Sequence, residues 1–467
     1  MGFLLAAVTS IALARPAWPL QSSANARYLT DQAGRPFLVT ADAAWCLING
    51  LTDEEIDTYL NTRKAQGFNA VQLMIMSQHS GCAVGGGSVD RYGESPFLSG
   101  DDDWSVPNEA YWSRVDRILD KLDARGMLAL ATPAYLGFSC YYGTQGWCAS
   151  MADQPVERMS AYGAFLGRRY RLKGNIIWIA GGDADPLQYT GIDERVDALM
   201  SALRAAEGGR HLITGHAGRG VTGFQSFGAH SWLTLNSAYD GESCPDDTMA
   251  SQIVTERTWS PNLPILSIEQ MFDAEGADAR CLADQFFWAV LEGGVGHTYG
   301  NGYVWSFSPG WDSDSGINSL GSRVQTNAAK LMRSRRYWLL EPDYTHQVVT
   351  AGYGSGSATV ATARVSTGET VIAYVPDGGT VVTVDLRRLT GARATAYWYD
   401  PETGVATSIG TFVTQGPMDF VSPGDAQVLV LDDAARQFPV PGLRDFQLRP
   451  RPSLREPRTL RDGFSRD

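Results

Sequence analysis

Two acidic residues, Asp183 and Glu269, stand at the ends of apolar runs and have the chemistry of a catalytic pair. Asp183 follows the run 176–180 and two glycines, and Glu269 closes the run 264–269. The glycines give the backbone the freedom to turn where a strand ends. Paired carboxyl groups can divide the work of general acid and nucleophile, which is the arrangement that cleaves glycosidic bonds.

That chemistry needs the two carboxyl groups in opposite charge states. The acid must be protonated near neutral pH, which an apolar setting or a negative neighbour favours, and the nucleophile must stay ionised, which hydrogen-bond donors favour. We assign Asp183 as acid/base and Glu269 as nucleophile. Asp185 competes for the acid/base role. Two structural alternatives stay open, in which Asp183 caps a loop and Glu269 forms an ion pair.

Other polar and aromatic residues at or just beyond the ends of apolar runs are expected to bind substrate beside this pair. They are Asp42, Trp45, His216, Asn236, Tyr239, His297 and Tyr299. Aromatic faces suit sugar rings, and the chain contains 13 Trp and 19 Tyr. For the two histidines, a hydrogen-bonded structural role is an equal alternative.

Strand and helix patterns alternate through the first 340 residues. Short apolar runs predict strands at 37–41, 70–76, 128–132, 176–180, 211–214, 232–236, 264–269 and 296–299. Amphipathic stretches predict helices at 52–66, 110–125, 156–171, 191–207, 244–256, 278–292 and 320–336. The first of these helices begins with the capping box Thr52-Asp53-Glu54-Glu55.

Eight strands, most of them followed by a helix, predict an α/β fold, the (β/α)8 TIM barrel, because right-handed crossovers between parallel strands close into a ring. Active sites of such barrels lie at the carboxyl ends of the strands. Asp183 ends the fourth strand and Glu269 the seventh, so they face each other obliquely across the mouth. An open doubly wound sheet is the alternative, disfavoured because no glycine-rich nucleotide-binding motif follows the first strand.

The pattern changes beyond residue 340. Short alternating runs separated by Gly, Asp and Pro turns predict a small all-β sandwich. We divide the chain into an N-terminal segment 1–17, a barrel domain 18–340, a sandwich domain 341–433 and a tail 434–467. The tail is rich in Arg and Pro and poor in apolar periodicity, so we expect it to be disordered or to lie along the surface.

The N-terminal segment and the cysteines indicate a secreted or periplasmic protein. The apolar run 3–8 and the Ala-Leu-Ala at 12–14 resemble a secretory signal peptide, although no Lys or Arg precedes Arg15. The six cysteines are an even number, as expected in an oxidising compartment, and Cys140 and Cys148 are close enough to bridge. No uninterrupted apolar run reaches the 18 residues of a membrane span.

Charge and motif content argue against several function classes. A net charge of −13 is unsuited to nucleic acid, because phosphate binding needs clustered cations. No His or Cys pair has zinc-ligand spacing and no H-E-x-x-H motif occurs, so we expect no metal and no other cofactor. The serine or cysteine triad of a protease is not evident either.

Several stretches resemble the apiosidase-like glycoside hydrolases, family 140. They are 27–29 with 42–45, Gly-Asn-Ile-Ile-Trp-Ile-Ala-Gly-Gly-Asp at 174–183, the strand 264–269, and Gly-Gly-Val-Gly-His-Thr-Tyr-Gly at 293–300. The resemblance covers roughly residues 18–340, and the sandwich looks like the C-terminal domain of collagen-binding type in the same proteins. It implies that Asp183 and Glu269 are the catalytic pair of a retaining exo-acting glycosidase, with apiose side chains of plant pectin as the well-established substrate class.

The predicted function is therefore a retaining exo-type glycoside hydrolase that acts on an apiose-like or other furanoside side chain of a plant or bacterial polysaccharide. Its expected partner is a polysaccharide or oligosaccharide. The alternative is a non-catalytic carbohydrate- or collagen-binding protein on a barrel scaffold, motivated by the sandwich and the aromatic content. The separation of the two carboxyl groups distinguishes mechanisms, at about 5–5.5 Å for retention and about 6.5–9.5 Å for inversion.

Overall fold

A computed structural model describes residues 15–82, 88–141, 145–240, 244 and 248–447. The apolar run of the expected signal peptide and the end of the expected tail, 448–467, lie outside the described residues. Within the described ranges, no helix combines the length and hydropathy needed to cross a bilayer.

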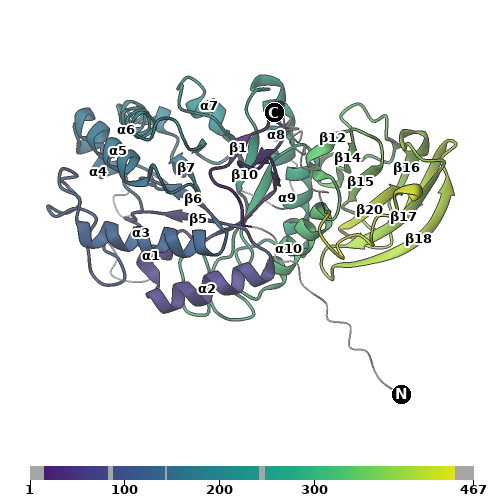
Figure 1. The fold of residues 1–467 in the computed structure, drawn as a ribbon, viewed down its shortest axis with the longest axis horizontal. Helices are drawn as coiled ribbons and strands as arrows, with labels where there is room; N and C mark the ends of the chain where they lie inside the picture. The colour runs from purple at the N-terminus through teal and green to yellow at the C-terminus, as the bar shows by residue number, and fades with distance from the viewer. Residues whose placement is uncertain (1–14, 83–87, 142–144, 241–243, 245–247, 448–467) are drawn as a thin grey trace, which may run out of the picture.

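Eight parallel strands form the centre of the first domain (Figure 1). They are β4 (Val39–Ala43), β5 (Ala70–Met74), β6 (Leu128–Thr132), β7 (Ile176–Gly181), β8 (Ile213–His216), β9 (Asn236–Tyr239), β10 (Ile265–Glu269) and β11 (Gly296–Tyr299). They pair in the order β8-β7-β6-β5-β4-β11-β10-β9. The two end strands also meet, because the amides of Thr234 and Leu235 both donate to the carbonyl of Ile213. The predicted TIM-like barrel is confirmed.

Helices follow most of these strands. The long ones are α2 (Asp53–Gln66), α3 (Glu109–Ala124), α5 (Val156–Tyr170), α6 (Ile192–Glu207), α8 (Thr248–Trp259), α9 (Ala279–Leu291) and α10 (Leu320–Arg333), and the short ones are α1 (Leu47–Gly50), α4 (Cys148–Asp153) and α7 (Gly223–Phe227). The capping box at Thr52 is present, with Thr52 and Glu55 each accepting the other's amide. Three short strands, β1 (Gln21–Ser22), β2 (Leu29–Thr30) and β3 (Pro36–Phe37), form a separate small sheet.

The sequence placed β8 and β9 too early, at 211–214 and 232–236. Both apolar runs begin in the turn before the strand. His211 and Trp232 are each hydrogen-bonded to a carboxylate on α6, at 2.6 and 2.9 Å, which holds them outside the strands. This shift matters for the site, because it makes His216 and Tyr239 the last residues of their strands.

The second domain is an all-β sandwich, as predicted. One sheet has the order β12-β14-β15-β20-β17-β18 and the other the order β13-β16-β19. The strands are β12 (Leu340–Pro342), β13 (Val349–Ala351), β14 (Ala361–Val365), β15 (Thr370–Val375), β16 (Val381–Asp385), β17 (Arg393–Asp400), β18 (Val405–Val413), β19 (Pro417–Val421) and β20 (Gln427–Asp433). Valine, leucine and aromatic side chains from both sheets form its own core.

The sandwich packs against α9 and α10 of the barrel (Figure 1). On α9, the Phe287 ring stacks on the Tyr374 ring at 4.9 Å, and the Tyr374 hydroxyl donates to Asp284 at 2.6 Å. Just beyond α10, the buried Arg335 pairs with Asp432 at 2.7 Å. The interface between the two domains is therefore packed, and the buried polar groups named here are paired across it.

The first part of the expected tail lies along the protein. The amide of Phe446 donates to the carbonyl of Arg333 at 2.7 Å, and the Phe446 ring contacts Trp338. Arg335 also donates to the carbonyl of Pro439 at 3.0 Å. The described residues 434–447 thus begin against β17 of the sandwich and continue onto the barrel near Arg333 and Trp338.

Replacing Asp284 is expected to change how stability depends on pH. Burial at the domain interface raises the pKa of Asp284 to about 7, against the opposing effects of Tyr374 and Arg280. The folded protein therefore holds this proton more tightly than the unfolded chain, so the stability it contributes is present below about pH 4 and is lost as pH rises through about 7. Asp284→Asn cannot titrate, so its stability relative to the wild type should increase by a few kcal/mol over that range.

Urea unfolding at several pH values between these limits measures this difference. Asp419→Asn, the same substitution at an exposed position, serves as the control for the removal of one carboxylate. A constant difference for Asp284→Asn would show that the interface does not hold the proton.

Candidate active site

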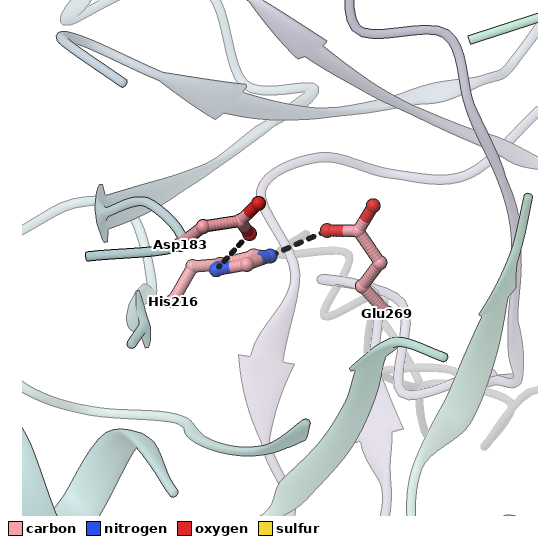
Figure 2. Close-up of side chains that lie close together, drawn as sticks. All are labelled: Asp183, His216 and Glu269. Atoms are coloured by element: carbon pink, nitrogen blue, oxygen red, sulfur yellow. Dashed lines mark hydrogen bonds and ion pairs between the residues drawn. The ribbon is translucent and has the colours of Figure 1, made fainter. Parts of the chain in front are cut away.

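Three side chains from neighbouring strand ends meet at the mouth of the barrel (Figure 2). Asp183 follows β7, His216 ends β8 and Glu269 ends β10. His216 Nε2 lies 2.6 Å from Glu269 Oε2, and His216 Nδ1 lies 3.8 Å from Asp183 Oδ1. A carboxylate oxygen of Asp183 and one of Glu269 are within 4.8 Å of each other. The expected carboxyl pair therefore shares one site.

A glycine turn brings Asp183 beside His216. Gly181 has φ 89°, and a Cβ at this position would lie 2.2 Å from the carbonyl oxygen of His216. Gly182 donates its amide to that same carbonyl at 2.8 Å. Only glycine permits so close an approach in this conformation, so the Gly-Gly-Asp sequence directly sets the distance between the acid and the histidine.

Two donors hold Glu269. The indole Nε1 of Trp45 donates to Oε1 at 3.0 Å, and His216 bonds to Oε2. The register of β10 shifts between Ser267 and Glu269, and such a bulge re-aims the side chain at a strand end. Burial raises the pKa of Glu269, the donors His216 and Trp45 act to lower it, and the charge of Asp183 adds to the increase.

Two successive hydrogen bonds, each donated in the same direction, lead from Arg219 to Asp183. Arg219 Nε donates to the Tyr239 hydroxyl at 3.2 Å, and that hydroxyl donates to Asp183 Oδ1 at 3.2 Å. Arginine cannot accept, so the proton of Tyr239 is directed to Asp183. Burial, followed by the charges of Asp183 and Glu269, raises the pKa of Tyr239 well above its ordinary value, which keeps the phenol protonated.

The carboxyl pair opens into a cavity of about 320 Å³. Aromatic, polar and acidic side chains line it: Trp45, Met74, His79, Tyr135, Phe138, Gln145, Asp183, Arg219, Tyr239, Glu269, Gln270, Met271, Phe272, Glu275 and Trp305. This volume lies at the small end of the usual range for ligand pockets. Polar side chains lie on several of its sides.

His79 and Trp305 form one wall of the cavity. The backbone segments that carry them are held in place near a disulfide. The Cys46–Cys82 bridge joins the loop after β5 to the segment after β4, and the amide of Cys46 donates to the carbonyl of Trp305. The amide of Gly81 donates to His79 Nδ1 at 2.9 Å, so Nε2 carries the ring proton. Burial lowers the pKa of His79. His79 is therefore a neutral donor in the cavity wall.

The described cysteines form two further disulfides, Cys140–Cys148 and Cys244–Cys281. The first is the bridge expected from the sequence. It ties the loop that carries Phe138, another residue of the cavity wall.

Of the residues expected to bind substrate, Trp45, His216 and Tyr239 lie at the carboxyl pair. Asp42 and Tyr299 do not line the cavity. Asp42 is fully buried and pairs with Arg63 of α2 at 2.7 Å, and the Tyr299 hydroxyl donates to Asp273.

Asn236 and His297 also point away from the cavity. Asn236 donates to Glu256 on α8 at 3.0 Å, and His297 Nδ1 bonds to Gln325 on α10 at 3.1 Å. Burial lowers the pKa of His297 to about 4, so this histidine is neutral. These side chains connect the barrel to its helices, which is the structural alternative that the sequence left open for His297.

Asp185, the competitor for the acid role, caps a short 3-10 turn. Its Oδ1 accepts from the amide of Leu187 at 3.2 Å and from the hydroxyl of Ser226 at 3.0 Å. Asp185 does not line the cavity. Asp183 does line it.

Sequence reasoning missed several residues of the cavity wall, namely Tyr135, Arg219, Gln270 and Glu275. All follow strand ends by one to six residues, within loops that carry no motif. Arg219 comes three residues after His216, so a wider search beyond the strand end would have found it.

Asp183, His216 and Glu269 also have the residue types of a metal site, and their ligand atoms are close together. The geometry does not fit one ion. The two ring nitrogens of His216 face different carboxylates, and an Nε2–Oε2 distance of 2.6 Å is that of a hydrogen bond. An ion bound to both atoms at about 2.0–2.2 Å would require them to lie farther apart.

Comparison with known proteins identifies a family and a fold. Residues 23–339 match the family of the apiosidase-like catalytic domain, and residues 342–432 match a domain described as "Putative collagen-binding domain of a collagenase". A solved "Glycoside hydrolase" aligns over 91% of this chain and 98% of its own, with 22% identity and a TM-score of 0.76. A family 5 glycoside hydrolase from Bacteroides vulgatus aligns over 92% and 96%, also with 22% identity and a TM-score of 0.76. No curated protein sequence matches the chain.

Asp42→Ala is expected to destabilise the fold. The substitution leaves the fully buried Arg63 without its counter-ion, which costs about 3–5 kcal/mol. Urea unfolding measures the loss. The double variant Asp42→Leu/Arg63→Met removes both charges and should recover most of it. Unchanged stability together with a loss of activity would instead place Asp42 among the substrate contacts.

Proposed function

Because the chain belongs to the family of apiosidase-like glycoside hydrolases, we propose that it removes a terminal sugar with retention of configuration. The sugar is an apiose-like or other furanoside side chain of a plant or bacterial polysaccharide. Asp183 acts as acid/base and Glu269 as nucleophile. The observation that carries this proposal is the separation of the two carboxyl groups.

One carboxylate oxygen of Asp183 and one of Glu269 lie within 4.8 Å of each other. Retaining enzymes hold their pair about 5–5.5 Å apart, whereas inverting enzymes need about 6.5–9.5 Å to admit a water molecule. The observed distance is shorter than the separation that admits this water. It supports direct attack by a carboxylate on the sugar.

The environments support the assignment of roles. Glu269 receives hydrogen bonds on both oxygens, which favours the ionised form that a nucleophile needs. Asp183 receives the Tyr239 hydroxyl on Oδ1, so a proton on this carboxyl group belongs on Oδ2. Asp183 is also the more accessible of the two, with 18% of its side chain exposed against 10% for Glu269.

The reaction has two balanced steps. Glu269 attacks the anomeric carbon while the bond to the leaving oxygen breaks, and Asp183 gives its proton to that oxygen. Asp183 then takes a proton from water, whose oxygen attacks the same carbon and releases Glu269 as a carboxylate. The cycle restores both groups.

The cavity supports an exo-acting enzyme on a small terminal sugar. Its volume of about 320 Å³ suits one ring and part of the next, and His79 and Gln145 offer hydroxyl partners. The family description supports apiose or a related furanoside as this sugar. We also propose that the protein works outside the cytoplasm, in accord with its three disulfides.

Replacing either carboxyl group should abolish sugar release. Asp183→Asn is expected to lower kcat by about 10²–10⁴-fold, and Glu269→Gln by about 10⁴-fold or more. Release of reducing sugar from branched pectic and arabinofuranose-containing polysaccharides provides the assay. Asp185→Asn is the matched control and should retain nearly full activity. Wild-type levels of sugar release by both variants would contradict the proposal.

Azide distinguishes the two roles. In Glu269→Ala it should occupy the space of the missing carboxylate and form a glycosyl azide of inverted configuration, whereas the wild type should release a product of retained configuration. Proton NMR of the first product identifies the anomer. A wild-type product of inverted configuration would rule out retention.

A further inference from the structure

We propose that His216 is a fixed counter-ion for the negative charge that moves between Glu269 and Asp183 during the reaction. This inference rests on the proposed function and concerns how the same site carries it out. His216 does not reach the reacting atoms of the sugar in this scheme. It is a positioning residue whose two ring nitrogens face the two carboxyl groups.

The imidazole ring lies between the carboxyl groups (Figure 2). Nε2 is bonded to Glu269 at 2.6 Å, and Nδ1 lies 3.8 Å from Asp183 Oδ1. His216 is fully buried, and Nδ1 has no hydrogen-bond partner within the described residues. The side chain that Nδ1 faces is therefore Asp183, at a distance that a small movement would close to a hydrogen bond.

Neighbouring rings hold this orientation. The Trp45 ring meets the imidazole at 71° with centroids 5.6 Å apart, and the Tyr239 ring lies 4.6 Å from it at 53°. Trp45 also donates to Glu269, and Tyr239 donates to Asp183. The residues that pack the ring thus also hold its two partners, so the ring cannot turn away from one carboxyl group without losing contacts.

The charge on the pair stays constant while its position changes. Before the first step Glu269 is a carboxylate and Asp183 is protonated. Once the Glu269–sugar bond has formed and Asp183 has given up its proton, Glu269 is a neutral ester and Asp183 carries the charge. The second step reverses this. A cation between the two groups lies next to the negative charge before and after it moves. It therefore stabilises both states, and it does not slow one step in order to speed the other.

The surroundings favour a protonated His216. Burial alone lowers its pKa, but the hydrogen bond to Glu269 and the charge of that carboxylate, with the charge of Asp183 whenever Asp183 is ionised, outweigh burial and raise it. The nearby phenols Tyr135 and Tyr239 stay protonated, because burial and the two carboxylates raise their pKa values well above the ordinary one.

Two other basic groups face the site. Arg219 carries a positive charge that opposes protonation of His216, but its Nε is directed to the Tyr239 hydroxyl. His79 is neutral, because burial lowers its pKa. Among the described residues that line the cavity, Arg219 is therefore the positive charge that opposes protonation of His216.

Nitrogen NMR of the free protein tests the charge of His216 without any substrate. The chain has 6 histidines, so a ¹⁵N-histidine-labelled sample gives a simple spectrum, and His216→Gln assigns the signal. We expect both ring nitrogens of His216 to be protonated at pH 7. In Glu269→Gln the signal should titrate at lower pH than in the wild type. A neutral His216 ring at pH 7 in the wild type would overturn the inference.

Kinetics test its consequence. His216→Gln keeps a neutral hydrogen-bond donor of similar reach but removes the positive charge. Because that charge is proposed to stabilise the reacting groups, the variant should lower kcat by about 10²-fold or more with little change in KM. Because both steps lose the counter-ion, the loss should persist whichever step limits the rate, including on substrates with good leaving groups. His346→Gln, in the sandwich domain, is the control. Full kcat in a folded His216→Gln protein would overturn the inference.

The two proposals fail in different ways. If the wild type releases no sugar from any polysaccharide tested, the proposed function fails, and with it the role of a moving charge. If the wild type is active but its His216 is neutral, or His216→Gln keeps full kcat, the hydrolase assignment stands and only the counter-ion is excluded.

Discussion

The close approach of β7 to β8 at Gly181 is the constraint on which the site depends. A side chain there would collide with the carbonyl of His216, and relieving that collision would move Asp183 away from the histidine. The bond from His216 to Glu269 then extends the same contact across the barrel mouth. One backbone position therefore controls the spacing of three titratable groups from three strands.

Much of the fold follows from local patterns. The βα alternation predicts the barrel, because helices with one apolar face and short buried strands have few other ways to pack. The capping box at Thr52 marks the start of α2. The structure places Asp183 and Glu269 together as expected, because each carboxyl group stands where a β-branched or apolar run ends abruptly at the mouth.

The rest of the site depends on information that a single sequence does not contain. Asp42, Asn236, His297 and Tyr299 also stand at strand ends, yet their side chains bond to helices or loops outside the cavity. Successive side chains of a strand point to opposite faces of the sheet. Which of them point toward the cavity depends on where the strand begins and on its bulges. A loop residue such as Arg219 is positioned by tertiary contacts and has no periodic signal of its own.

Helix α9 gives the chain one more property. Every residue from 281 to 291 is buried, with Phe286 near His297 of the barrel and Phe287 against Tyr374 of the sandwich. A helix that is buried on every face, as α9 is over 281–291, keeps that environment only while its neighbours cover it. Separating the domains would expose the side chains of α9 that face the sandwich, Phe287 among them. The barrel therefore depends on the sandwich to cover this helix, although the sandwich has a core of its own.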